Sequence, residues 1–338
     1  MTDISQQRKM IPKCPVCECM DRRHWLNAGG FELVRCAGCG HRYSMQVLAG
    51  DLLANSYYSE SVHDIASRVN SAKADRFPVY LDMLGRAGRA SGRVLDVGCN
   101  AGELLHFFAH HGWSIAGIET SPGPAEYARN KLRAPIWQGT VEEVLPDSER
   151  FDVITLTHVL EHIVAPVPFL RRLRRAMDDG ILLLEVPNAN DLLLRFWRGT
   201  YRPLCPGDHV SFFDLSSFDL LLGRSGFEVI EVRSPTQARD VIYPSILSAF
   251  DYLRHAVPNV KFARSRESFS EIGVLGQARY RGRFREPLRR IIDGFAAAID
   301  PLVGRATQHS RGKGSVLIVT ARVAKEEPAD CHSLANDR

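Results

Sequence analysis

Residues 93–105 have the sequence RVLDVGCNAGELL, and this stretch decides the fold class of the chain. A short apolar run surrounds Asp96, a glycine-rich turn extends from Gly98 to Gly102, and a helical pattern begins directly after it. A buried strand, a tight glycine turn and a helix in this order form the first unit of an α/β sheet that binds a nucleotide at the turn. The stretch therefore predicts a ligand site at the carboxyl end of the strand.

The flanking sequence repeats this alternation of strand and helix. Further apolar runs of strand length alternate with helix-length segments, a pattern typical of βαβ units around a parallel sheet. The runs lie at 114–118, 151–156 and 181–186, and the helical segments at 102–111, 122–132 and 164–177. Other segments complete the pattern with strands at 134–138, 227–232 and 314–323 and a helix at 215–224. We therefore expect an α/β fold.

The residues of the turn discriminate between two classes of ligand. A dinucleotide site carries G-x-G-x-x-G, but Glu103 stands at the third glycine position, where its carboxylate would repel a pyrophosphate. A zwitterionic amino acid fits better, because its ammonium group can approach Asp96 and its carboxylate can bind the backbone amides of the turn. Glu119 ends the second strand, where a carboxylate can accept hydrogen bonds from both ribose hydroxyls.

Three segments resemble the class I S-adenosylmethionine-dependent methyltransferases, specifically the bacterial small-molecule branch that shares an LEH motif. They are VLDVGCNAGELLHFFAHHGWSIAGIETSPGPAEYAR at 94–129, FDVITLTHVLEHIVAPVPFLRRLRRAMDDGILLLEVPN at 151–188 and GFEVIEV at 226–232. The resemblance implies a Rossmann-like sheet of seven strands in the order 3-2-1-4-5-7-6, with the last strand antiparallel. It also implies methyl transfer with S-adenosyl-L-methionine as the cofactor.

The resemblance further assigns cofactor-binding residues near the ends of the strands. It places Asp96, Gly98, Cys99, Asn100 and Gly102 at the methionine end, Glu119 at the ribose, Thr120, Thr140 and Val141 at the adenine, and Thr157 with His158 below the sulfonium. Many relatives carry an aspartate for the adenine amino group after the third strand. This chain has QGTVEEV at 138–144, which leaves Thr140, Val141 or Glu142 for that contact.

The segment HVLEH at 158–162 follows the fourth strand and supplies candidate catalytic residues. His158 or His162 can remove a proton from a nucleophile that attacks the methyl group, because the pKa of histidine lies near neutrality. Alternatively, His158, Glu161 and His162 hold a divalent ion, in likeness to quinone methyltransferases with a Glu-x-x-Glu-His set, or they have a structural capping role. We exclude a zinc protease, because the segment follows a strand and does not lie within a long helix.

Residues 191–214, DLLLRFWRGTYRPLCPGDHVSFFD, are the predicted acceptor side of the site. Arginine there suits a phosphate or carboxylate group. The resemblance adds His209 to the candidate catalytic residues, with a lid packed by its aromatic residues as the alternative. For Trp197 and Tyr201 the packing interpretation is favoured, and Tyr57 and Tyr58 are expected either to fold over the cofactor or to pack a helix.

Two cysteine pairs near the N-terminus predict a structural zinc site. Cys14 and Cys17 are separated from Cys36 and Cys39 by 18 residues, a spacing typical of four-cysteine zinc modules. Four thiolates close the coordination shell, so this zinc should fold the module and take no part in chemistry. Cys19, His24 and His41 are alternative ligands that the spacing disfavours.

These observations predict four regions. Residues 1–50 form a tail and the zinc module, 51–90 a helical linker or lid, 91–235 with 312–325 the methyltransferase domain, and 236–311 a helical insertion. The insertion contains the basic stretch RYRGRFREPLRR, for which we expect a peripheral membrane contact, an acidic partner or a dimer contact.

Composition limits the partners and the location. The formal net charge of the 338 residues is only +4, so nucleic acid is not indicated. The sequence shows neither a secretory signal nor an apolar stretch of membrane-spanning length, and a cytoplasmic location is expected.

The leading functional hypothesis is a methyltransferase that acts on a small molecule, for example a nucleotide-linked sugar, a glycan or a lipid-linked precursor, with O-methylation favoured. Two alternatives are an RNA or protein methyltransferase that uses the zinc module for recognition, and a cofactor-binding scaffold without catalysis.

Overall fold

The computed structural model describes residues 8–48, 76–197, 204–205, 207–236 and 312–325, together with a few single residues between 242 and 303. The chain divides into two compact units, each made of several segments. The first contains Met1–Tyr57, Val186–Leu215 and Arg233–Ile318, and the second contains Tyr58–Glu185, Ser216–Val232 and Val319–Arg338.

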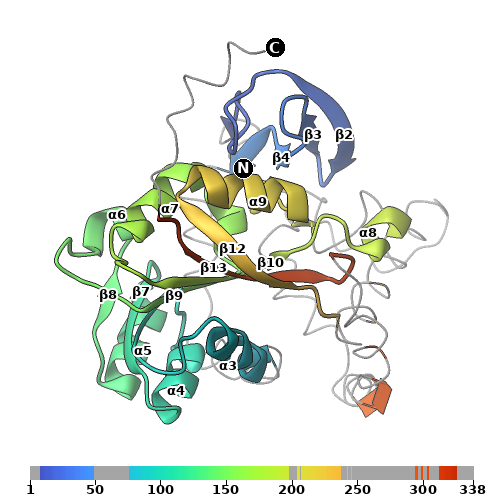
Figure 1. Cartoon of the computed structure of the whole chain (residues 1–338). Coiled ribbons are helices and arrows are strands. Elements are labelled where there is room, and N and C mark those ends of the chain that lie inside the picture. Colours follow the sequence, from blue (N-terminus) through green and yellow to red (C-terminus); the bar gives the residue numbers. More distant parts are fainter. Residues whose placement is uncertain are drawn as a thin grey trace. The chain divides into compact units, whose positions relative to one another are not determined.

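A sheet of seven strands forms the central layer of the fold (Figure 1). Its strands are β6 (Arg93–Val97), β7 (Ser114–Glu119), β8 (Ile136–Gln138), β9 (Val153–Thr157), β10 (Ile181–Pro187), β12 (Phe227–Arg233) and β13 (Val316–Val323). Their order across the sheet is β12-β13-β10-β9-β6-β7-β8. Numbered along the chain, this is the predicted order 3-2-1-4-5-7-6, so the predicted fold class is confirmed.

The direction of the strands also agrees with the prediction. β6 pairs in parallel with β7 and β9, β7 with β8, and β9 with β10. The amide of Asn188, after β10, donates to the carbonyl of Ser315, before β13, while the amide of Val323, at the end of β13, donates to the carbonyl of Gly180, before β10. These two hydrogen bonds join opposite ends of the strands, so β13 runs antiparallel to β10 in a mixed sheet.

Helices cover both faces of this sheet. Figure 1 shows α3 (Phe77–Arg86), α4 (Glu103–His110) and α5 (Pro122–Leu132) on one face, and α6 (Val141–Val144), α7 (Pro166–Arg174) and α9 (Leu215–Arg224) on the other. Proline stands in the first turn of α3, α5 and α7, where its missing N–H costs no hydrogen bond. In α7 the apolar residues Phe169, Leu170 and Leu173 are buried, and none of the arginines of this helix is among its buried residues.

Because helices cover both faces of the sheet, its central strands consist almost entirely of apolar residues. Five of the seven residues of β10, ILLLEVP, are apolar, and six of the seven are buried. Glu185 interrupts this run and is fully buried. A charged side chain in such a place needs partners, because burial of an isolated charge is unfavourable.

The N-terminal part of the first unit is a small β module. It contains β1 (Arg8–Met10), β2 (Arg22–Ala28), β3 (Phe31–Cys36), β4 (Arg42–Ser44) and β5 (Gln46–Leu48). β11 (Ser211–Phe212) joins this module from a distant part of the chain and forms the four-stranded sheet β11-β4-β3-β2, while β1 pairs with β5. A buried apolar cluster of this unit includes Phe31, Leu33 and Phe212, and also Leu194 of α8 (Leu192–Trp197).

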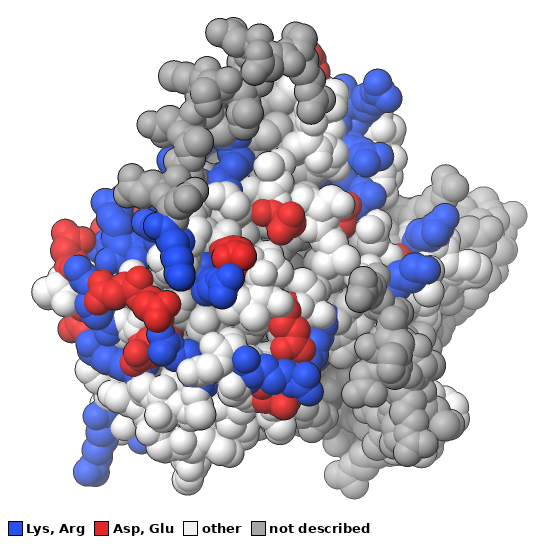
Figure 2. Space-filling model, viewed as in Figure 1, with Lys and Arg blue, Asp and Glu red and all other residues white. Residues whose placement is uncertain are grey.

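Figure 2 shows acidic and basic side chains intermixed over the left half of the face in view, as the low formal charge of +4 leads one to expect. None of the helices in the described part of the chain has the length and apolar content needed to cross a membrane. Several predictions concern residues outside the described part of the chain. These are Tyr57, Tyr58, Tyr201 and, apart from a few single positions, the helical insertion at 236–311. The side chain of Trp197 is likewise not described.

Candidate functional site

The turn between β6 and α4 has a backbone that demands glycine at two positions. Gly98 and Gly102 have φ angles of 73° and 81°, which place both in the left-handed region. A β-carbon on Gly98 would lie 2.6 Å from Cγ2 of Val159, and one on Gly102 would lie 2.6 Å from Cδ1 of Leu132. Glycine therefore lets the turn approach Val159, just before the η3 helix (Leu160–His162), and α5 closely.

Most backbone amides of the turn already have partners within the protein. The amides of Gly98 and Cys99 donate to the carbonyl of Ile118, and that of Gly102 donates to the carbonyl of Cys99. Within the described part of the chain, the amide of Ala101 has no such partner. The donors available to a carboxylate are therefore this amide and those at the start of α4, a smaller set than the whole turn that the sequence suggested.

The two predicted acidic residues lie at the ends of neighbouring strands. Asp96 on β6 is buried, and its Oδ1 accepts a 2.6 Å hydrogen bond from the hydroxyl of Thr155. Glu119, at the end of β7, is 8% exposed, and its two carboxylate oxygens accept hydrogen bonds from the amides of Asn100, at 2.9 Å, and Ser121, at 2.8 Å. The hydroxyl of Thr120 donates to Oε1 of Glu119 as well, at 3.4 Å. A carboxylate can accept about four hydrogen bonds, so Glu119 holds the turn in place and keeps capacity for one further hydroxyl group.

Asn100 is a second sign that this site is built for a ligand. It adopts a φ of 50°, and its side-chain Oδ1 is buried and has no hydrogen-bond partner among the described residues. A buried polar atom without a partner costs about 1 to 3 kcal/mol. A ligand with a hydrogen-bond donor would satisfy this atom.

The other predicted cofactor residues have different surroundings. Cys99 is buried, and this burial raises the pKa of its thiol. Thr140 forms a capping box with Glu143 at the start of α6, and Val141 beside it is buried. Thr120 is exposed and Thr157 half-buried. The assignment of these residues to the adenine or the sulfonium stays a prediction.

His158 is the centre of a buried network of charged groups that the sequence did not reveal. Its backbone has a φ of 56°, in the left-handed region that non-glycine residues rarely occupy. Its Nδ1 lies 3.2 Å from Oε1 of Glu161 and its Nε2 lies 2.9 Å from Oε1 of Glu185. Both nitrogens face carboxylates, so both contacts are hydrogen bonds only when the ring is doubly protonated.

Glu185 has two further partners, one just before α3 and one within it. Arg76 Nη1 donates to its Oε1 at 2.6 Å, and the hydroxyl of Tyr80 donates to its Oε2 at 2.5 Å. Burial alone would raise the pKa of Glu185, but the positive charge of Arg76 and the hydrogen bonds from His158 and Tyr80 hold it well below the usual range. The sequence had grouped His158 with Glu161 in HVLEH, and the charged residue in the apolar run ILLLEVP was the only signal that Glu185 joins them.

The remaining catalytic candidates are Glu161, His162 and His209. Glu161 and His162 belong to the η3 helix in the second unit, where Glu161 is buried and His162 half-buried. His209 belongs to the first unit, where it is 7% exposed and its ring centroid lies 6.4 Å from that of Phe212. Catalytic roles for these residues stay predictions.

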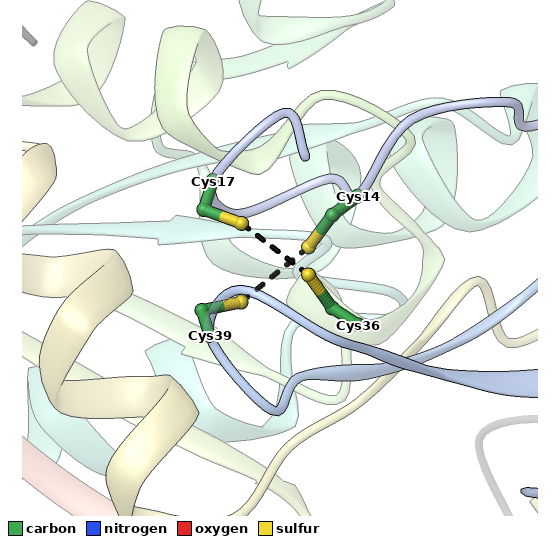
Figure 3. Close-up of side chains that lie close together, drawn as sticks. All are labelled: Cys14, Cys17, Cys36 and Cys39. Atoms are coloured by element: carbon green, nitrogen blue, oxygen red, sulfur yellow. Dashed lines mark hydrogen bonds between the residues drawn. The ribbon is translucent and has the colours of Figure 1, made fainter. Parts of the chain in front are cut away.

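The four predicted cysteine ligands converge in the first unit (Figure 3). The sulfur atoms of Cys14 and Cys39 are 3.6 Å apart and those of Cys17 and Cys36 are 3.4 Å apart. A tetrahedral zinc ion with Zn–S bonds of about 2.3 Å separates its sulfur ligands by about 3.8 Å. All four sulfur atoms lie within 4.8 Å of one another, so the cluster is compact enough to surround such an ion.

The alternative ligands have other contacts. Cys19 Sγ lies 3.7 Å from the carbonyl of Asp21, and His24 faces Glu32 on the surface. His41 is fully buried with its Nε2 3.2 Å from the hydroxyl of Ser211, and burial lowers the pKa of its ring to about 3.

Known proteins are similar to this chain over its sheet domain. Residues 69–232 match the model of a family described as a methyltransferase domain. A ubiquinone biosynthesis O-methyltransferase of Azorhizobium caulinodans is 29% identical over 41% of this chain and 60% of its own length. One from Hahella chejuensis is 26% identical over 55% of this chain and 85% of its own length. The chain spans about half the length of several other curated relatives that it matches.

Among solved structures, an S-adenosylmethionine-dependent methyltransferase from Archaeoglobus fulgidus is similar with a TM-score of 0.42 and 14% identity, over 81% of this chain and 99% of that protein.

Proposed function

We propose that this protein transfers a methyl group from S-adenosylmethionine to a small-molecule acceptor. The observation that carries the proposal is the glycine turn of the matched methyltransferase domain, held by Glu119 and built with the buried, unsatisfied Oδ1 of Asn100. Relatives described as O-methyltransferases favour transfer to oxygen.

The residues of the turn fit the parts of this cofactor. Asp96 suits the ammonium group of its methionine part, and the Ala101 amide with the start of α4 suits its carboxylate. The remaining acceptor capacity of Glu119 suits a ribose hydroxyl. When bound, S-adenosylmethionine supplies a methyl group on a positively charged sulfur, which is already a reactive electrophile.

Reaction at an acceptor hydroxyl needs a group that takes the proton. His158 is poorly suited, because both of its ring nitrogens face carboxylates and leave no lone pair for a proton or for a divalent ion. We assign it a positioning role, in which it fixes Glu161 and the η3 helix beside the glycine turn. His162, half-buried in the same helix, is then the proposed general base.

The proposal extends to the module and to the acceptor. The cysteine quartet holds a structural zinc ion, because four sulfur ligands leave no open position for substrate or water. Free thiols suited to metal binding agree with a cytoplasmic, reducing environment. A nucleotide-linked sugar, a glycan or a lipid-linked precursor is the proposed class of acceptor.

Binding of S-adenosylhomocysteine, measured by titration calorimetry, tests the cofactor site directly. Wild-type protein should bind it, and Glu119→Ala should bind roughly tenfold or more weakly, because hydrogen bonds to a charged group contribute about 1.5 to 3 kcal/mol. Glu126→Ala, an exposed carboxylate on α5, is the matched control. Equal affinity in wild-type protein and Glu119→Ala would remove Glu119 from the site, and absence of binding to wild-type protein would refute the proposal.

A further inference from the structure

The first unit contains a pocket that shares no lining residue with the glycine turn. Its volume is about 600 Å³, within the range of sites for small organic molecules. Its walls come from three distant segments: Trp25 and Arg42 of the β module, Arg195 of α8, and Lys313 before β13. All of these segments belong to the same compact unit.

All charged residues that line the pocket are positively charged. Arg42, Arg195 and Lys313 line it, and no acidic side chain of the described residues does. Asp214 balances Arg42 through a 2.9 Å ion pair. Arg195 and Lys313 are exposed and form no ion pair within the described part of the chain. Two uncompensated positive charges on one concave surface attract an anion.

Arg42 also has a donor that the protein leaves unused. Its Nη1 donates to Asp214 and its guanidinium carbon lies 5.2 Å from the ring centroid of Trp25. Its Nε is buried and has no hydrogen-bond partner among the described residues. Ion pairing and stacking hold the guanidinium in one place, so this N–H is a preorganised donor.

The position of Lys313 is set by the loop that carries it. Gly312 has a φ of 70°, and a β-carbon on Gly314 would clash with the carbonyl oxygen of Ser234. The side-chain amide of Asn188, which is buried, donates to the carbonyls of Gly312 at 3.0 Å and of Gly314 at 2.7 Å. The backbone on either side of Lys313 is therefore clamped, and the loop presents this lysine to the pocket.

The rest of the pocket is suited to an apolar or aromatic group. Leu26, Leu194 and Leu215 contribute aliphatic surface, and Trp25 contributes an aromatic ring. A free inorganic anion would leave this surface unused. An organic molecule with an anionic end would contact both parts.

We propose that this pocket binds an organic diphosphate ester, with the diphosphate at Arg42, Arg195 and Lys313 and the organic group against Trp25 and the leucines. Diphosphate is favoured over a single carboxylate, because several separated cations face one cavity and arginine and lysine both bind phosphate oxygens. The binding of this ligand is independent of the proposed function. Its role as the methyl acceptor rests on the proposed function.

Titration calorimetry with the full-length protein tests the pocket without the methyl donor. The probes are uridine diphosphate, geranyl diphosphate and inorganic pyrophosphate. At least one organic diphosphate should bind more tightly than pyrophosphate, and the preferred one distinguishes a nucleotide from a prenyl source. Lys313→Gln and Arg195→Gln should each weaken this binding roughly tenfold, since each removes a charged hydrogen-bond partner. Lys9→Gln removes an exposed charge of the same unit that does not line the pocket, and it should leave the affinity unchanged.

The outcomes separate this proposal from the proposed function. No binding of either organic diphosphate, equal binding of pyrophosphate, or an affinity that Lys313→Gln and Arg195→Gln leave unchanged would overturn the pocket assignment. S-adenosylhomocysteine titrated into the same samples reports the cofactor site independently, and both substituted proteins should retain that binding.

Discussion

Substitution of Glu185 by glutamine is predicted to destabilise the second unit by about 3 kcal/mol at pH 7. Glutamine keeps the shape of the side chain, its carbonyl oxygen can still accept from Arg76 and His158, and the hydroxyl of Tyr80 can turn to accept from its amide. The change therefore removes mainly the charge. Loss of one member of a buried ion pair costs about 3 to 5 kcal/mol, because its partner stays buried without compensation. The retained hydrogen bonds place the expected value at the lower end of this range.

The pH dependence follows from the lowered pKa of Glu185. Folding lowers the pKa of Glu185 below its ordinary value of 4.5, so the ionised carboxylate stabilises the folded protein. This stabilisation is complete at pH values above 4.5 and is lost as the pH falls toward the pKa of the folded state. The stability difference between wild-type protein and Glu185→Gln should therefore narrow by about 1.4 kcal/mol for each pH unit below 4.5.

Urea unfolding at several pH values, together with amide hydrogen exchange of β9 and β10, measures this difference. Glu142→Gln removes an exposed carboxylate and should change stability by no more than about 0.5 kcal/mol. A Glu185→Gln protein as stable as wild type at pH 7, or a difference that does not narrow in acid, would refute the account of the network.

Three other predictions concern the turn, the metal and the base. Gly102→Ala should destabilise the protein by about 1 to 2 kcal/mol, because alanine is strained in the left-handed region; urea unfolding measures this, and an unchanged midpoint would contradict it. Cys36→Ser should lower the zinc content found by elemental analysis and unfold the β module while S-adenosylhomocysteine still binds; full zinc occupancy would reject the quartet. His162→Gln should lower kcat about 100-fold or more with little change in donor affinity, and this loss should shrink as rising pH ionises the acceptor; a pH-independent loss points to a structural role.

Much of the fold was predictable because its signals are local. The apolar runs around Asp96 and Glu119, the glycines of the turn and the prolines at helix starts each act within a few residues, and the structure places strands and helices at the expected positions. The convergence of the cysteine pairs was predictable for the same reason. In each pair the two cysteines are separated by two residues, a spacing that lets both sulfur atoms face the same metal ion.

The contacts that complete each site were not predictable in this way. The capping box that Thr140 forms with Glu143 at the start of α6 was not predicted, whereas its contact with adenine stays a prediction. Most amides of the glycine turn turned out to be engaged, because the parallel register with β7 places the Ile118 carbonyl beside them. The basic pocket joins residues 25, 195 and 313, whose spacing carries no pattern.

By itself the sequence determined the order of strands and helices, the site at the end of the first strand and the four-sulfur cluster, since periodicity, turn geometry and ligand spacing are properties of short segments. Tertiary structure alone decided that Glu185 is ionised between Arg76, Tyr80 and His158. Arg76 and Glu185 are 109 residues apart, and a buried charge acquires its partners only when the sheet and α3 have packed together.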